Sequence, residues 1–156
     1  MTERRIITSR KYYVNQFQAD INNLKRTIDE TIDYFDRTFI HMDEDTRLEL
    51  RVVINELLVN AVKHGCKIDS VSSVKVVAGM LTDDCALLIV EDDGDGYDTA
   101  FLSGSRNRKA FERDFCNVEE TGRGINIVKK LCEDFMVNEK GNKVVINKKL
   151  RRAKAV

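Results

Sequence analysis

Proline is absent from this chain of 156 residues, and strongly apolar runs are short. The longest such run, Ala86 to Val90, falls far below the roughly 20 residues that a helix needs to cross a bilayer. The N-terminal residues Thr2 to Arg5 are polar and charged, which is not the pattern of an export signal. We therefore expect a cytoplasmic protein that neither enters nor contacts a membrane.

Cysteine pairs are also lacking. The sequence has no C-x-x-C pair, and its cysteines are far apart, so their spacing fits neither a zinc site nor a compact disulfide framework. They stand at Cys66, Cys85, Cys116 and Cys132. Reduced thiols are expected, in agreement with a cytoplasmic location.

An excess of one charge is missing as well, because 26 basic residues balance 26 acidic ones. With 42% hydrophobic and 33% charged residues, the composition argues against a disordered chain and against a broadly basic nucleic-acid binder. A chain of this length buries roughly two thirds of its unfolded surface, enough for a core. We expect one domain over residues 1–156, with a protein or small-molecule partner and no direct contact with nucleic acid.

The first half of the chain is predicted to open with a short strand and continue with two helices. Arg4 to Ser9 is compatible with a strand. From Asn15 to Ile40, apolar residues recur every three or four positions, which predicts one long amphipathic helix whose outer face is open to partners. Thr46 and Glu49 form a capping-box pattern that starts a second helix running to about His64.

The second half predicts an antiparallel hairpin from Val71 to Leu81 and from Cys85 to Val90, with its second strand buried on both faces. The apolar period from Ile125 to Phe135 predicts a helix, and Val144 to Ile146 predicts a closing strand. The expected fold is therefore α+β. It is a two-layer sandwich in which helices cover one face of a mixed, mostly antiparallel sheet.

The second predicted helix carries a narrow polar stripe. Glu56, Asn60 and Lys63 stand at i, i+4 and i+7 and so share one side of the helix. A solvent-facing polar edge explains this stripe about as well as a binding site does, although asparagine has little helix propensity to justify its place there. As a site, Asn60 would offer Mg²⁺ an oxygen ligand, Glu56 would accept a proton and Lys63 would reach phosphates.

The second motif is the turn Asp92-Asp93-Gly94-Asp95-Gly96, which follows the buried strand. A calcium loop starting at Glu91 would place Leu102 at its twelfth position, where a bidentate glutamate is required. A plain acidic turn is the other alternative. We favour a nucleotide contact, because a carboxylate at the end of a buried strand accepts a hydrogen bond from the exocyclic amine of adenine.

The third motif, Gly122-Arg123-Gly124, is predicted to precede the helix that begins near Ile125. Backbone amides at a helix N-terminus form an anion site that suits phosphates. Such a turn is weak evidence by itself, and no Walker loop or protein-kinase signature is present. Residues 97–121 have weak periodicity and many charges, and we interpret this stretch as a mobile lid over the nucleotide.

Taken in order, the pattern N-E-x-x-x-N-A-x-K-H-G, then D-x-G-x-G, then G-x-G resembles the Bergerat-fold ATPases, the superfamily of gyrase B, Hsp90, MutL and histidine kinases. The small size and the histidine-glycine ending of the first motif most resemble the bacterial anti-sigma factor serine/threonine kinases. This resemblance implies that Glu56 is the catalytic base, Asn60 the Mg²⁺ ligand and Asp92 the adenine contact.

The ATP-binding residues predicted in this way are Asn60, Lys63, His64, Asp92, Gly94, Gly96, Thr121, Gly122, Arg123, Gly124 and Asn142. Asn142 stands where the family often has threonine. Four basic residues of the lid are alternative contacts for the γ-phosphate, and the sequence does not rank them: Arg106, Arg108, Lys109 and Arg113.

The resemblance also implies partners. The relatives bind a sigma factor, phosphorylate a serine of an anti-anti-sigma antagonist with ATP and Mg²⁺, and commonly form dimers. One alternative is a module that binds ATP and a partner protein without transferring phosphate. Another is a stand-alone histidine-kinase-like ATPase, although His41 lacks the context of a phosphoacceptor and is predicted to be a linker residue.

Overall fold

The computed structural model describes residues 7–8, 12–65, 72–94 and 118–155. In these ranges the strands are β1 (Ile7–Thr8), β2 (Tyr12–Gln18), β3 (Ser73–Met80), β4 (Cys85–Asp92), β5 (Asp134–Val137) and β6 (Lys143–Lys149). The helices are α1 (Ile21–Thr38), α2 (Glu44–Gly65) and α5 (Val118–Leu131). Each helix in the described ranges is too short or too polar to span a membrane.

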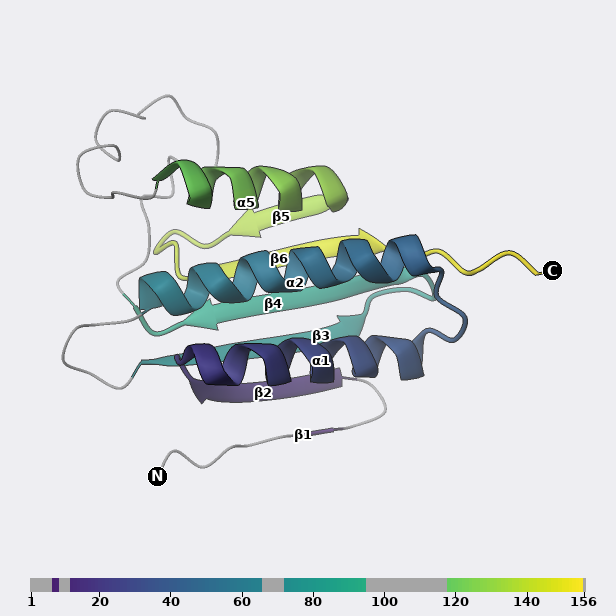
Figure 1. Ribbon diagram of the computed structural model, residues 1–156, viewed down its shortest axis with the longest axis horizontal. Coiled ribbons are helices and arrows are strands. Elements are labelled where there is room, and N and C mark those ends of the chain that lie inside the picture. Colours follow the sequence, from purple (N-terminus) through teal and green to yellow (C-terminus); the bar gives the residue numbers. More distant parts are fainter. Residues whose placement is uncertain (1–6, 9–11, 66–71, 95–117, 156) are drawn as a thin grey trace.

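The six strands form one sheet in the order β1-β2-β3-β4-β6-β5. Every described pair of neighbours is antiparallel, so the expectation of a mixed sheet is corrected to an antiparallel one. Figure 1 shows the three helices lying side by side on one face of this sheet. The predicted α+β two-layer architecture is confirmed.

The long helix predicted from Asn15 to Ile40 is wrong at its start. Residues 12–18 form β2, which pairs with β3 along its whole length, and α1 begins only at Ile21. Phe17 fits both a helical period and the alternation of a strand, so the pattern alone was ambiguous. Asp20 ends the ambiguity, because its side chain accepts a hydrogen bond from the Asn22 amide at 2.9 Å and caps the helix.

The start of α2 also differs from its prediction. The Thr46 amide donates to Asp43 Oδ1 at 2.7 Å, and the Arg47 amide donates to the Asp43 carbonyl at 3.0 Å. Asp43 is therefore the capping residue, and Thr46 lies inside the first turn. The capping motif begins three residues earlier than predicted because aspartate fills the same role as threonine.

The helix predicted from Ile125 to Phe135 is displaced along the chain. α5 starts at Val118 and ends at Leu131, and Phe135 lies in β5, where it pairs with Ile146 of β6.

The prediction that β4 is buried on both faces is also wrong. Its side chains alternate between buried and half-buried, so only one face of the strand is fully buried. His41, as predicted, lies in the connection between two helices, where its φ of 65° turns the chain.

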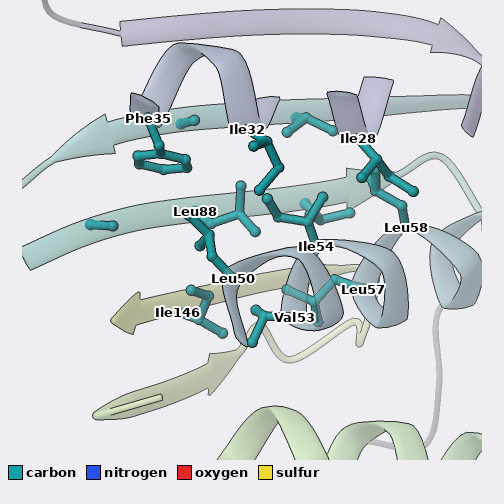
Figure 2. Packing of buried hydrophobic residues seen from close by; sticks show 14 of the residues in the cluster. Ile28, Ile32, Phe35, Leu50, Val53, Ile54, Leu57, Leu58, Leu88 and Ile146 are labelled. Carbon is teal, nitrogen blue, oxygen red and sulfur yellow. The ribbon is translucent and has the colours of Figure 1, made fainter. Parts of the chain in front are cut away.

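The core lies between the helices and the sheet. Figure 2 shows Ile32 of α1 and Ile54 of α2 meeting above Leu88 of β4, with Ile146 of β6 beneath α2. Leu88 and Ile146 are paired residues of adjacent strands. Burying each such side chain contributes about 1.5–3 kcal/mol, so α2 is held firmly on the sheet.

A buried ion pair ties three elements together at the end of the core away from the motifs. Lys148 of β6 is only 2% exposed, and its ammonium lies 2.7 Å from Glu49 Oε2 of α2. The same ammonium donates to the carbonyl of Leu131, the last residue of α5, at 2.8 Å. Lys148 thus fixes the C-terminal end of α5 against α2 and the sheet, a role that the sequence pattern did not indicate.

Candidate functional site

The three sequence motifs belong to elements that meet at one edge of the molecule. Figure 1 shows the C-terminal end of α2, the end of β4, the turn between β5 and β6 and the N-terminal end of α5 at the same edge. α2 packs directly against both β4 and α5. The fold therefore brings the described parts of the motifs into one neighbourhood.

The polar stripe of α2 runs from the interior toward the surface. Glu56 is half-buried, Asn60 is 7% exposed and Lys63 is exposed. A solvent-facing edge would leave Asn60 in water, so its burial favours a specific task for its carboxamide. The backbone of His64 belongs to the last turn of α2, and its side chain lies outside the described residues.

Asp92 occupies the last position of β4 and is 6% exposed. Its Oδ1 accepts a hydrogen bond from the Gly94 amide at 2.8 Å, which orients the carboxyl group at the strand end. Burial raises the pKa of Asp92, with Asp93 and Glu91 adding to the rise, while the Gly94 amide and Lys140 oppose it. A carboxyl group that is costly to keep buried is a candidate for a functional role.

Asn142 is held by bonds that join the ends of β4 and β6. Its Nδ2 donates to the Asp92 carbonyl at 2.7 Å, and its Oδ1 accepts from Asn138 Nδ2 at 2.8 Å. The Asp92 amide in turn donates to the Asn142 carbonyl at 2.9 Å. Asn142 therefore positions Asp92, and its own contact with ATP stays a prediction.

Asn138 was missed by the sequence reasoning. Besides its bond to the Asn142 side chain, its Oδ1 accepts from the amides of Asn142 and Lys143, both at 3.1 Å. An asparagine that begins a tight turn containing a glycine is the signal that could have identified it. Gly141 supplies the positive φ of 77° that this turn requires.

The third motif does not form the predicted anion site at a helix start. Gly122 and Gly124 lie inside α5, whose first residue is Val118. Their amides come after the first turn, and only the first four amides of a helix lack partners within it. Glu119 and Glu120 favour the earlier start, because acidic residues stabilise the first turn of a helix. Arg123 is exposed, and the side chain of Thr121 lies outside the described residues.

Most of the predicted lid lies outside the described residues. The structure does not describe residues 95–117, which include Gly96 and the four basic residues that are candidates for the γ-phosphate contact. Residues 118–121, the end of the predicted lid, form the first turn of α5. That part of the prediction is corrected from lid to helix.

Gly124 brings α5 against Glu56. A Cβ atom placed on Gly124 would lie 3.1 Å from Glu56 Cδ and closer still to Glu56 Oε2. The third motif therefore meets the first one through this contact.

The donor chemistry of the site fits a magnesium nucleotide. In the described ranges, no group of three or more His, Cys, Asp or Glu residues could hold a metal by itself. Mg²⁺ bound to ATP needs fewer protein ligands, because it keeps several waters and takes phosphate oxygens from its substrate. The buried carboxamide of Asn60 could supply an oxygen ligand in that mode of binding.

Comparisons with known proteins identify the family of this chain. Residues 17–148 match the family described as the histidine kinase-like ATPase domain. A solved structure of the mycobacterial sensor histidine kinase MprB is similar with 18% sequence identity and a TM-score of 0.46, covering 88% of this chain and 98% of that chain. A search of curated proteins found no match. The chain belongs to the histidine kinase-like ATPase domain family, which includes anti-sigma factor kinases and implies ATP binding.

Proposed function

We propose that this chain is an ATP- and Mg²⁺-dependent protein serine/threonine kinase of the anti-sigma factor type. It would transfer the γ-phosphoryl group of ATP to a serine of an antagonist protein in a partner-switching circuit. The observation that carries this proposal is the pair formed by half-buried Glu56 and buried Asn60, one helical turn apart on α2.

The residues have separate tasks in this reaction. The serine oxygen attacks the γ-phosphorus, the bond to the β,γ-bridging oxygen breaks, and ADP departs. Glu56 accepts the serine proton, while Asp92 holds the adenine amine. Asn60 would hold Mg²⁺, which neutralises charge on the phosphates when bound. Lys63 adds positive charge near the phosphates from the exposed end of the stripe.

Incubation with labelled ATP, Mg²⁺ and a candidate antagonist tests the proposal. The antagonist would be a small protein with a phosphorylatable serine, taken from the genes adjacent to the one that encodes this chain. Phosphoserine should form with the parent protein and fall by about 100-fold or more with Glu56→Gln. Asp93→Asn is the matched control, because Asp93 is exposed at the same edge and has no assigned task.

Phosphorylation that persists in Glu56→Gln would contradict the role of Glu56. Tight ATP binding without transfer to any antagonist, together with stable capture of a sigma factor, would favour the alternative of a non-catalytic binding module. Phosphate on a histidine would favour a stand-alone histidine-kinase-like ATPase. Dimer formation stays a prediction that sedimentation can test.

A further inference from the structure

α5 approaches α2 so closely at Gly124 that position 124 can hold a side chain only if the end of Glu56 moves. An ideal Cβ there would lie 3.1 Å from Glu56 Cδ and 3.7 Å from Glu56 Cγ, with Oε2 nearer than either. Non-bonded carbon atoms normally lie about 3.5–4.0 Å apart. Gly124 is buried, whereas Glu56 is half-buried.

Backbone conformation does not explain why glycine stands at this position. Among the described glycines, only Gly141 has a positive φ, and Gly124 lies within the regular helix α5. Alanine is the better residue inside a helix, because glycine loses more conformational freedom on folding. The amide of Gly124 comes six residues after Val118, beyond the first turn, so it is not one of the donors left open at the helix start.

We propose that Gly124 is a positioning residue for Glu56. Because it lacks a side chain, α5 packs directly on the carboxylate and restricts the rotamers that Glu56 adopts. A side chain at 124 would push the flexible end of Glu56 out of place while both helices stay folded. The catalytic part of this inference rests on the proposed function, since it assumes that Glu56 accepts the serine proton.

Thermal unfolding of four full-length proteins tests the contact without any assay of activity: the parent, Gly124→Ala, Glu56→Ala and the double variant. With Glu56 replaced, alanine at 124 should act only through helix propensity and raise the unfolding midpoint by about 2–4 °C. With Glu56 present, the same change should raise the midpoint by less or lower it. An equal shift in both backgrounds would overturn the proposed contact.

Steady-state kinetics test the positioning role. In Gly124→Ala, kcat for phosphoryl transfer should fall by about 10- to 100-fold, because a base displaced by about 1 Å loses that much rate. The KM for ATP should stay within about threefold of the parent value, because the task assigned to Glu56 is proton transfer. A loss carried by KM with unchanged kcat would overturn the positioning role and indicate a nucleotide contact instead.

Shortening the carboxylate provides a rescue test. Glu56→Asp is expected to be slower than the parent, but its carboxylate is one methylene further from position 124. Adding Gly124→Ala to Glu56→Asp should therefore cost less than about threefold in kcat. The same fold-loss in both backgrounds would contradict the proposal. If the parent transfers no phosphate, the proposed function fails, while the unfolding experiment still decides whether the contact exists.

Discussion

Asp92 and Asn142 illustrate how single residues fix the backbone at the end of β4. Four hydrogen bonds join Asn142 to Asp92 and Asn138, so the protein itself fixes the position of the Asp92 backbone. The carboxyl group itself is buried at this fixed point, which is unfavourable for its charged form. Burial of this charge costs folding free energy, which is typical of a residue kept for function.

Replacement of Asp92 by asparagine should stabilise the protein at neutral pH. Because burial raises the pKa of Asp92 in the folded state, its ionisation costs folding free energy as the pH rises above the unfolded value and through the folded one. The cost disappears below the unfolded pKa of about 3.9, where the carboxyl becomes protonated in both states. Asp92→Asn should therefore unfold at a higher temperature than the parent at pH 7, with the difference shrinking toward pH 4.

The same variant should bind ATP roughly tenfold more weakly, because a charged acceptor for the adenine amine becomes neutral. Calorimetry and thermal unfolding at several pH values measure the two effects. Exposed Asp93→Asn should change each by much less, because Asp93 only adds to the rise of the Asp92 pKa. An Asp92→Asn variant that is less stable than the parent at pH 7 would contradict the inference that the buried charge of Asp92 costs folding free energy.

At the scale of elements, the sequence pattern identified α2, β3, β4 and β6 with errors of a few residues at their ends. The apolar patterns of α2, β3 and β4 each fit one period, and the short run from Val144 to Ile146 follows a glycine turn. It failed at β2, where Phe17 suited two periods, and at β5, where Phe135 continued the helical period of α5. In both places the deciding interaction is a ladder of backbone hydrogen bonds to a strand distant in the sequence, β3 or β6, which no local pattern contains.

The boundary between β2 and α1 depends on the Asp20 cap. Asp20→Ala removes the acceptor of the Asn22 amide and should lower the free energy of unfolding by about 1 kcal/mol. Asp20→Asn keeps an acceptor and should cost much less. Urea unfolding compares the two variants, and equal losses would show that the cap is not what starts α1.

The ion pair between Lys148 and Glu49 should contribute strongly to the docking of α5. Glu49→Ala leaves a buried ammonium with only the Leu131 carbonyl and should cost about 3 kcal/mol in urea unfolding. Glu49→Ala combined with Lys148→Met should recover more than half of that loss, because no buried charge is left. Arg151→Ala removes the exposed bond to Glu49 and should cost far less.

A double variant that is less stable than Glu49→Ala would contradict this explanation.

The ion pair between Lys148 and Glu49 also affects the pH dependence of stability. Burial would raise the pKa of Glu49, but the hydrogen bonds from Lys148 and Arg151 outweigh it and lower the pKa. The stabilisation from Glu49 is therefore present above its unfolded pKa and is lost as the pH falls through its folded pKa.

At the scale of the whole molecule, the antiparallel sheet and its helices bring motifs more than 25 residues apart to one edge. ATP should stabilise that assembly. Saturation at 100 times Kd adds about 2.7 kcal/mol, which corresponds to a rise of about 5–10 °C in the unfolding midpoint. Asn60→Ala should lose the part of this shift that depends on Mg²⁺. Arg51→Ala, which alters only an exposed ion pair between α2 and α1, should keep the full shift.

Thermal unfolding with and without ATP, each with Mg²⁺ or with a chelator, separates these contributions. An Asn60→Ala protein whose shift still depends on Mg²⁺ would remove Asn60 from the metal site. A parent protein without any shift would contradict the ATP binding that the family implies.

By itself, the sequence determined the order of the motifs, the polar stripe of α2 and the family to which they point, because these depend on residue type and on spacing within one element. The tertiary structure decided the rest: that Asn60 is buried, that Asn142 holds Asp92, that Gly122 and Gly124 lie inside a helix, and that Gly124 leaves room for Glu56. Each of these depends on contacts between segments far apart in the chain. Such contacts are set by packing and by backbone pairing, and no local pattern encodes them.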